Sequence, residues 1–205
     1  MNNSMKKPMK TKPKILWKFL RIGLKSDGGK HCQWRLGEWR KESDIKICDE
    51  GFHCSQTPLQ ALGYVKGEIL AQVEVRGESI VESDKECWSE MRIVKAWHWT
   101  KEDSVSLAIY AAEQVIDIYE KKYPNDGRPR KAIEAAKKWL KNPTADAADA
   151  ANAADAAAYA ANAAAYAADA AARARKELTK KINIWFAKRI KTLARLNPLI
   201  SSLTF

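Results

Sequence analysis

Residues 145–174 read ADAADAANAADAAAYAANAAAYAADAAARA, a tract in which 21 of 30 residues are alanine. The interruptions are three or four residues apart throughout, and from Asn152 onward they repeat every seven residues. Alanine is the strongest helix former, and this spacing places the interrupting side chains on one stripe of a helix. The tract therefore predicts a long helix with a broad, smooth alanine face, which needs a large partner surface.

The segments before this tract also predict helices. Thr100 and Asp103 form a variant of the capping box, which opens a helix that ends near Lys122. Proline is favourable at the first position of a helix, so Pro129 begins a second helix that stops before Asn142. The second half of the chain is therefore expected to be a helical bundle with the alanine tract as its spine.

A basic amphipathic helix is predicted at residues 178–196, after the tract. Its apolar stripe, which is expected to cover the alanine face, consists of Leu178, Ile182, Trp185, Phe186, Ile190 and Leu193. Lys188 and Arg189 lie beside this stripe and are candidate binding residues for an acidic partner. A single helix from residue 143 to 196 would be about 80 Å long, so we expect a bend or break near residues 172–178.

Before Thr100 the sequence has the pattern of strands with one short helix. Short apolar or alternating runs predict strands at residues 15–20, 34–39, 51–55, 69–75 and 91–99. Residues 58–64 predict a helix with Ser55 or Thr57 as its N-cap and Pro58 at its first position. The expected fold class is α+β: a small, mixed, strand-rich N-terminal domain followed by an alanine-rich α-helical bundle.

These patterns divide the chain into four segments. Residues 1–14 are polar, with several lysines and two prolines, and predict a disordered basic arm. We expect an α+β domain at residues 15–100, a helical domain at 101–196 and a C-terminal tail at 197–205.

The net charge of +11 is concentrated at the two ends of the chain. Residues 1–30 carry +8 and residues 173–205 carry +8, whereas the segment between them carries −5. Such a distribution fits an acidic partner, which could be a protein, a nucleic acid or a membrane surface. Basic ends that only aid solubility are the alternative.

The cysteines and the hydropathy pattern bear on location and on metal binding. No stretch is long and apolar enough for a membrane span, and the N-terminus lacks the apolar core of a secretory signal. Cys32, Cys48, Cys54 and Cys87 contain no CxxC pair, which favours free thiols in a reducing cytoplasm. Their spacing, and that of the neighbouring histidines, is poor for structural zinc, so we expect no metal site.

Residues 47–95 carry a recognisable series of short motifs. They contain a Cys, then Gly-Phe-His, a Pro-Leu-x-x-Leu-x-Tyr helix, a Val-Glu-Val-x-Gly strand and an Asp-Lys pair. With this series the segment resembles a family of domains of unknown function that is common in phage and prophage proteins. The resemblance implies a phage or prophage setting, and the family has no known activity.

A second resemblance involves the stretch YPNDGRPRKAIEAA at residues 123–136, Trp139 and the alanine tract after it. With these residues, segment 107–175 resembles the immunity-protein family associated with bacterial polymorphic toxins. The resemblance implies an all-helical fold and a role in neutralising a toxin by binding it.

His53 and Tyr64 form a weaker candidate site. A strand after Gly51 followed by a helix that bears a tyrosine resembles ADP-ribosyltransferase-like folds, in which such elements line a nicotinamide pocket. The resemblance implies a glutamate later in the chain, such as Glu74 or Glu78. The alternative, which we favour, is that this strand and helix simply pack against each other.

Two further pairs of residues are candidates for binding. Arg128 and Arg130 lie where a loop joins a helix, and they could contact a carboxylate or phosphate or brace the turn through helix-terminal carbonyl groups. Trp97 and Trp99 share one face of a predicted strand, so they could form an exposed pair for bases or for a protein, or pack in the core.

The leading hypothesis is a non-enzymatic, immunity-like binding protein of the phage or mobile-element type. It would bind and occlude a partner protein with an acidic surface, namely a toxin or a defence effector, without a catalytic residue, cofactor or metal. One alternative is an ADP-ribosyltransferase-like nucleotide-binding domain at the N-terminus. The other is nucleic-acid binding through the basic ends. The sequence leaves the oligomeric state open.

Overall fold

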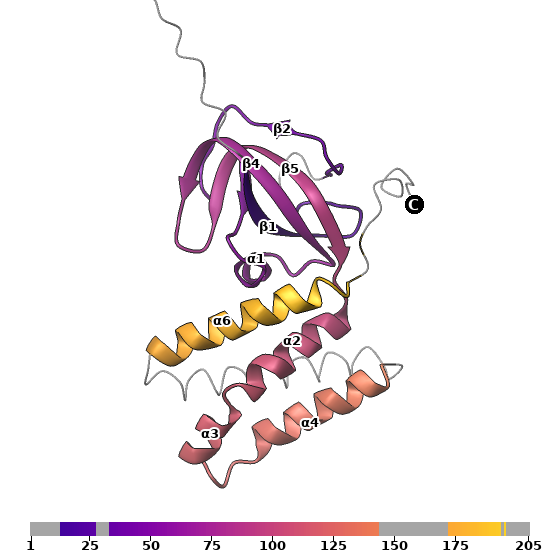
Figure 1. Cartoon of the computed structure of the whole chain (residues 1–205), viewed down its shortest axis with the longest axis vertical. Helices are drawn as coiled ribbons and strands as arrows, with labels where there is room; N and C mark the ends of the chain where they lie inside the picture. The colour runs from indigo at the N-terminus through magenta and orange to yellow at the C-terminus, as the bar shows by residue number, and fades with distance from the viewer. Residues whose placement is uncertain (1–12, 28–32, 144–171, 194, 196–205) are drawn as a thin grey trace, which may run out of the picture. The chain divides into compact units, whose positions relative to one another are not determined.

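The computed structural model describes residues 13–27, 33–143, 172–193 and 195 (Figure 1). The predicted tail lies outside these residues, as do the predicted arm except for its last two residues and the alanine tract except for residues 172–174. The described residues form two compact units, of which the first contains residues 13–97 with Arg195 and the second residues 98–193. A strand-rich unit followed by helices confirms the predicted α+β class.

The first unit is a five-stranded antiparallel sheet with one helix. Its elements are β1 (Lys14–Leu20), β2 (Arg40–Lys41), β3 (Phe52–Cys54), α1 (Pro58–Tyr64), β4 (Ile69–Val81) and β5 (Glu86–His98). Neighbouring strands follow the order β1–β4–β5–β2, and β3 also pairs with β5. The register of β1 on β4 runs from Lys14 opposite Val75 to Leu20 opposite Ile69.

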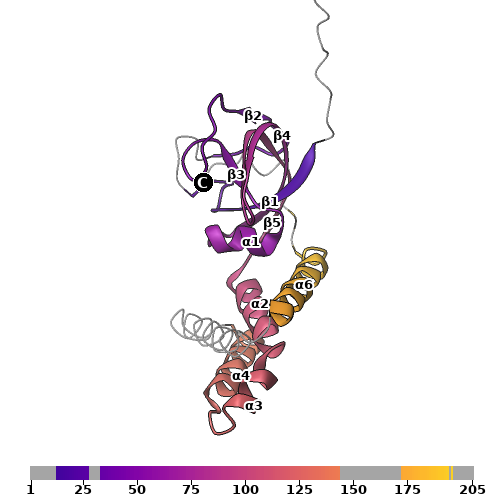
Figure 2. The same cartoon turned by 90° about the vertical axis from the view of Figure 1, so that its left-hand side faces the viewer.

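Two backbone hydrogen bonds close this sheet on itself. Ser55, directly after β3, exchanges N–H to carbonyl bonds of 2.8 Å in both directions with Trp17 of β1. Because β3 also pairs with β5, the strands form a ring, whose curvature is visible in Figures 1 and 2. Closure pairs a strand edge that would otherwise be free to bind another chain.

Alternating side chains fill the interior of this ring. Ala71, Val73 and Val75 of β4 are buried, whereas Gln72 and Glu74 between them are more accessible, as the period-two pattern predicts. The core cluster also contains Ile69 of β4 and residues of the other strands and loops, namely Leu16, Leu20, Leu24, Trp34, Phe52, Cys54, Met91, Ile93 and Ala96.

Helix α1 begins as its sequence predicts. Thr57 is the N-cap, its hydroxyl accepts a hydrogen bond from the Gln60 N–H, and the Gln60 side chain accepts one from the Thr57 N–H at 3.1 Å. Pro58 occupies the first position. Ser55, the other candidate cap, is instead part of the bridge to Trp17.

The predicted strand at residues 34–39 is wrong. Gly37 has a φ of +81°, which ends an extended run, and only isolated bridges form at Gln33 and Leu36. The Trp34 side chain is buried, where its indole N–H donates to Ser26 Oγ at 2.8 Å. Strands β4 and β5 are longer than predicted, and the turn between them is closed by a bond from Glu82 N–H to the Lys85 carbonyl.

The second unit is helical. It consists of α2 (Lys101–Glu113), α3 (Ile116–Lys122), α4 (Arg128–Lys141) and α6 (Ala172–Arg189), and α2 packs against both α4 and α6 (Figure 1). Its core cluster comprises Val105, Ile109, Ala112, Ile116, Ile133, Ala136 and Trp139.

Two predicted helix boundaries differ from the structure. The helix expected from Thr100 to Lys122 is divided, because Val115 leaves the helical conformation, and both Val115 and Ile116 are buried at this point. The segment before residue 172, which the predicted bend or break would join to the next helix, lies outside the described residues, and helix α6 begins at Ala172. It ends at Arg189 rather than at 196, because the Thr192 hydroxyl and N–H both donate to the Arg189 carbonyl, at 2.8 Å each, and form a turn.

Candidate functional site

The turn between α3 and α4 is built around one carboxylate, that of Asp126. The Tyr119 hydroxyl donates to its Oδ2 at 2.7 Å, and the Arg128 N–H donates to its Oδ1 at 3.1 Å. The Arg128 guanidinium adds two parallel bonds, of 2.8 Å from Nε to Oδ1 and 2.7 Å from Nη2 to Oδ2. The bonds from Arg128 and then from Tyr119 hold the pKa of Asp126 well below its usual range. The turn is therefore fixed by its own side chains.

Arg130 fixes the helices on both sides of this turn. Its Nε and Nη2 atoms donate to the two carboxylate oxygens of Glu120 in α3, at 2.5 and 2.6 Å, and this pairing lowers the pKa of Glu120. Lys137 of α4 pairs with Glu113 of α2 at 2.5 Å. Arg128 and Arg130 were predicted either to bind an external anion or to brace the turn through carbonyl groups. In the structure both bind carboxylates of this chain instead.

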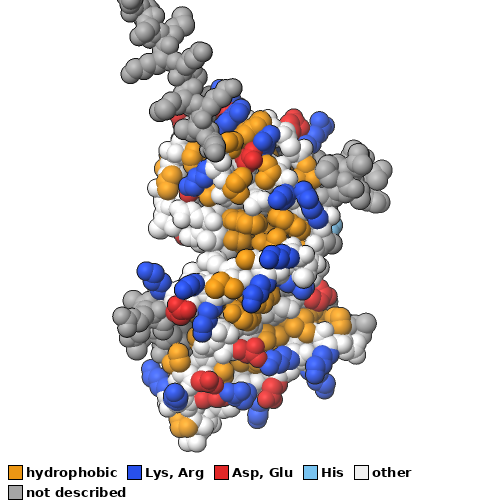
Figure 3. Space-filling model, in the orientation of Figure 1, with side chains coloured by type: hydrophobic (Ala, Val, Ile, Leu, Met, Phe, Trp, Pro, Cys, Tyr) orange, Lys and Arg blue, Asp and Glu red, His pale blue; other side chains and the backbone are white. Residues whose placement is uncertain are grey.

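The same turn lines a groove with a volume of about 670 Å³. Its walls include Lys122, Tyr123, Pro124, Arg128 and Lys131. The Tyr123 ring is 45% exposed, lies 4.9 Å from the Tyr119 ring and has the Lys122 ammonium 5.4 Å from its centre. The groove therefore presents an aromatic ring with lysines on a rigid base. Lys and Arg side chains alternate with acidic ones over the face of the helices seen in Figure 3.

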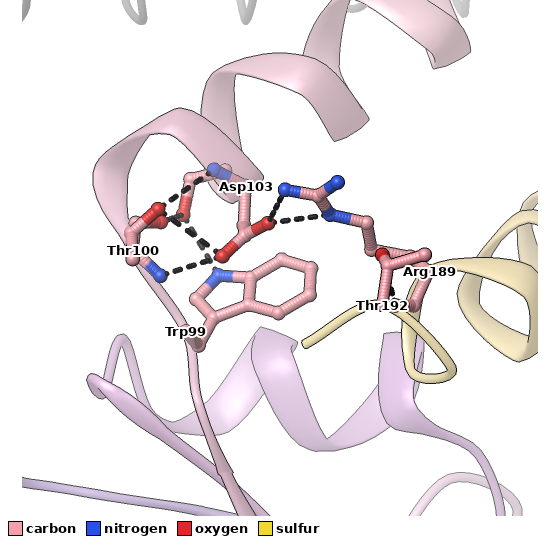
Figure 4. A network of polar contacts seen from close by, with 6 residues as sticks. Trp99, Thr100, Asp103, Arg189 and Thr192 are labelled. Atoms are coloured by element: carbon pink, nitrogen blue, oxygen red, sulfur yellow. Dashed lines mark hydrogen bonds and ion pairs between the residues drawn. The ribbon is translucent and has the colours of Figure 1, made fainter. Parts of the chain in front are cut away.

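Trp99 and Arg189 lie in a polar network inside the helical unit (Figure 4). The Trp99 indole N–H donates to Ser104 Oγ at 2.9 Å, and its ring stacks on Phe186 with a centroid distance of 5.3 Å. Asp103 completes the capping box with the Thr100 N–H and is only 1% exposed. The Arg189 guanidinium binds Asp103 Oδ1 at 2.6 Å from Nε and 2.5 Å from Nη2. Both predicted binding residues therefore have structural partners.

Trp97 was a candidate for an exposed pair with Trp99, and Lys188 lies next to Arg189. Trp97 is buried, whereas Lys188 is exposed. Trp97 is buried in the first unit, where its ring stacks on Trp17 with a centroid distance of 6.1 Å. Trp97 and Trp99 therefore form no exposed aromatic pair. Lys188 is exposed on α6, next to the engaged Arg189.

The structure brings His53 and Tyr64 to the wall of one cavity, of about 170 Å³. His53 Nε2 accepts a bond from the Cys48 N–H at 2.8 Å, and burial, helped by the charge of Lys18, lowers the pKa of His53. The Tyr64 hydroxyl donates to Asp84 at 2.5 Å, which raises the pKa of Tyr64. The cavity is smaller than the roughly 300–1,000 Å³ of most ligand sites.

The predicted glutamates do not complete a nucleotide site around that cavity. Glu74 binds Arg92, and Glu78 lies on the exposed end of β4, so neither lines the cavity. His53 Nε2 and the Tyr64 hydroxyl already form hydrogen bonds within the chain. Packing of the strand against the helix describes this region better than a nicotinamide pocket does.

The residues that the structure describes hold no metal-ligand cluster and no membrane-spanning helix. Within them, no group of three or more His, Cys, Asp or Glu side chains is placed to hold a metal ion. None of the helices that the structure describes is long and apolar enough to cross a membrane.

Sequence reasoning missed most of the partners that define these sites. No local sequence signal indicates the contacts of Tyr119 with Asp126 or of Glu120 with Arg130. The Asp-Gly-Arg sequence, in contrast, is a local signal for the Asp126–Arg128 pair. Asp103 and Arg189 are 86 residues apart, so no local signal joins them.

Both halves of the chain are similar to known families. Residues 14–103 match the family described as "Domain of unknown function (DUF7666)", and residues 98–177 match the family described as "Imm-5 like putative immunity protein". Both resemblances drawn from the sequence are thus confirmed. No curated protein and no solved structure is detectably similar to the chain. The second match includes the whole α3–α4 turn.

Proposed function

We propose that this chain is an immunity-type protein of a phage or another mobile element, which binds a toxin protein and blocks it by occlusion. The helical unit would make the contact through the groove at the α3–α4 turn. The observation that carries this proposal is the combination of the immunity-family match with a rigid, exposed aromatic and basic turn inside the matched segment.

The rigidity of the turn supports a role in binding. Asp126 and Arg130 hold the groove in one conformation before any partner arrives. A surface fixed in this way loses little conformational entropy on association, so more of the contact energy appears as affinity. The bracing arginines would therefore act by shaping the surface, while other residues contact the partner.

The chemistry of the groove supports an acidic partner. Tyrosine is enriched among residues that dominate binding energy, and Tyr123 is exposed at the mouth of the groove. Lys122 and Lys131 add positive charge beside it. Opposite charge on the toxin would accelerate association and favour the correct orientation.

Growth protection tests the proposal. Each toxin domain encoded beside this gene would be expressed in a bacterial host, with and without the full chain. We expect the chain to restore growth and to bind the purified toxin. The double variant Tyr123→Ala, Lys131→Glu should weaken binding about ten-fold or more, since it removes an aromatic contact and reverses a charge.

A matched control separates the groove from general charge effects. Lys138→Glu makes the same charge change seven residues further along α4, outside the groove lining, and should leave binding and protection unchanged. Protection that survives the groove double variant would refute the assigned surface. Failure of the intact chain to neutralise any neighbouring toxin would refute the immunity role.

A further inference from the structure

An unusual contact in the first unit joins Cys48 to Lys85. The Lys85 ammonium donates to the sulfur of Cys48, with 2.7 Å between Nζ and Sγ. Hydrogen bonds from N–H to oxygen span about 2.7–3.2 Å, and those to the larger sulfur atom are longer. The nitrogen and sulfur are therefore closer than an ordinary hydrogen bond places them. Their separation is that of two atoms joined through a single oxygen.

Both side chains are held in this arrangement by other contacts. Cys48 has a φ of +62°, and its N–H is fixed by the bond to His53 Nε2. Lys85 also contacts the carboxylate of Glu82 at 3.4 Å, lies 5.5 Å from the Tyr64 ring centre and is only 17% exposed. The approach of nitrogen to sulfur is therefore built into the loop before β3 and the turn between β4 and β5.

Among the cysteines that the structure describes, Cys48 differs in access. Cys54 and Cys87 are buried, whereas Cys48 is exposed. Burial raises the pKa of the Cys54 thiol to about 12 and also raises the pKa of Cys87, which keeps both protonated and unreactive. Reactive cysteines lie in electropositive, partly exposed surroundings. Cys48, with a lysine ammonium against its sulfur, has such surroundings.

We propose that Cys48 and Lys85 form an oxidative cross-link in which one oxygen atom joins Sγ to Nζ. The oxidant is dioxygen. The thiolate, the ammonium group and one O₂ molecule give the S–O–N bridge and one molecule of water. The O–O bond and two N–H bonds break, while one S–O bond, one O–N bond and the two O–H bonds of the water form. Sulfur and nitrogen each lose two electrons, and dioxygen accepts the four.

The cross-link would connect two segments that are 37 residues apart. It would fasten the loop before β3 to the turn between β4 and β5, beside the cavity that Tyr64 lines. A covalent closure of this kind restricts the unfolded chain, as a disulfide does. The first unit should therefore be more stable in its oxidised form, and a thiol reductant should reverse the effect.

Peptide mapping of the full chain tests the cross-link. The protein would be prepared in dithiothreitol without oxygen, and one half exposed to air-saturated buffer before alkylation and trypsin digestion. We expect a linked peptide containing Cys48 and Lys85, heavier than the sum of its parts by one oxygen less two hydrogens, about 14 Da. Trypsin should not cut after the linked Lys85. Dithiothreitol should restore both the free thiol and the cleavage.

Three variants show whether the pairing is specific. Lys85→Gln and Cys48→Ser should each abolish the linked peptide, whereas Lys66→Gln, at an exposed lysine of the same unit, should retain it. Melting curves of the reduced proteins would establish that the variants are folded. Because the intact chain is tested first, a poorly folded variant does not decide the outcome.

Other oxidation products would overturn the proposal. Sulfenic or sulfinic acid on Cys48 with normal cleavage after Lys85 would mean that the lysine does not take part. A linked peptide that has lost two hydrogens without gaining oxygen would mean a direct S–N bond. A disulfide between Cys48 and Cys32 would show that another thiol is the preferred partner.

Discussion

At the scale of single residues, Asp126 makes the stability of the helical unit depend on pH. Its pKa is depressed in the folded state, so its contribution is present above the unfolded pKa and is lost as the pH falls. We expect the melting temperature to drop as the pH is lowered below about 4, the ordinary value for an aspartate. Asp126→Asn should melt lower at pH 7 and show a smaller drop. Glu134→Gln, at an exposed carboxylate of α4, should behave like the parent chain.

Arg189 allows a second prediction at this scale. Replacing it with methionine leaves the carboxylate of Asp103 buried without its cation. Breaking a buried pair is costly, and because Arg189 is partly exposed we expect a loss of about 2–4 kcal/mol in the free energy of unfolding. Urea denaturation measures it. Lys188→Met, next to it on α6, should change stability by about 0.5 kcal/mol or less. Equal losses from the two variants would contradict the pairing.

At the scale of elements, the start of α1 depends on one hydroxyl. Thr57→Ala removes the side-chain acceptor for the Gln60 N–H, and loss of an N-cap costs about 1 kcal/mol. Thermal denaturation of the full chain should show the loss in the transition of the first unit. Thr57→Ser keeps the hydroxyl and should recover most of it. If the serine and alanine variants melt together, the cap contributes nothing.

Elements were predictable from the sequence where neighbouring residues decide them. The caps at Thr57 and Thr100 and the alternation in β4 need only residues within a few positions, and the structure has them as expected. The division of the helix at Val115 and the burial of Trp34 against Phe52 depend on packing with segments that are distant in the sequence. For the same reason the sequence indicates Arg128 and Arg130 as site residues but does not indicate that Tyr119 and Glu120 contribute to the same turn.

At the scale of the whole molecule, the charge of +11 predicts how association responds to salt. Attraction between a basic protein and an acidic partner is screened over about 8–10 Å at physiological ionic strength. We expect the association rate with the toxin to fall several-fold between low and high salt, while the dissociation rate changes less. Stopped-flow or surface-based kinetics measure both rates. An association rate that does not change with ionic strength would show that the basic groups do not face the partner.

The bridge between Ser55 and Trp17 also makes the first unit observable by hydrogen exchange. Each amide donates to the other residue's carbonyl, so neither proton can exchange with solvent while the two bonds are intact. Both protons become available in one event, when β1 separates from the segment after β3. The two amide protons should therefore have equal protection factors, which report how often the ring of strands opens.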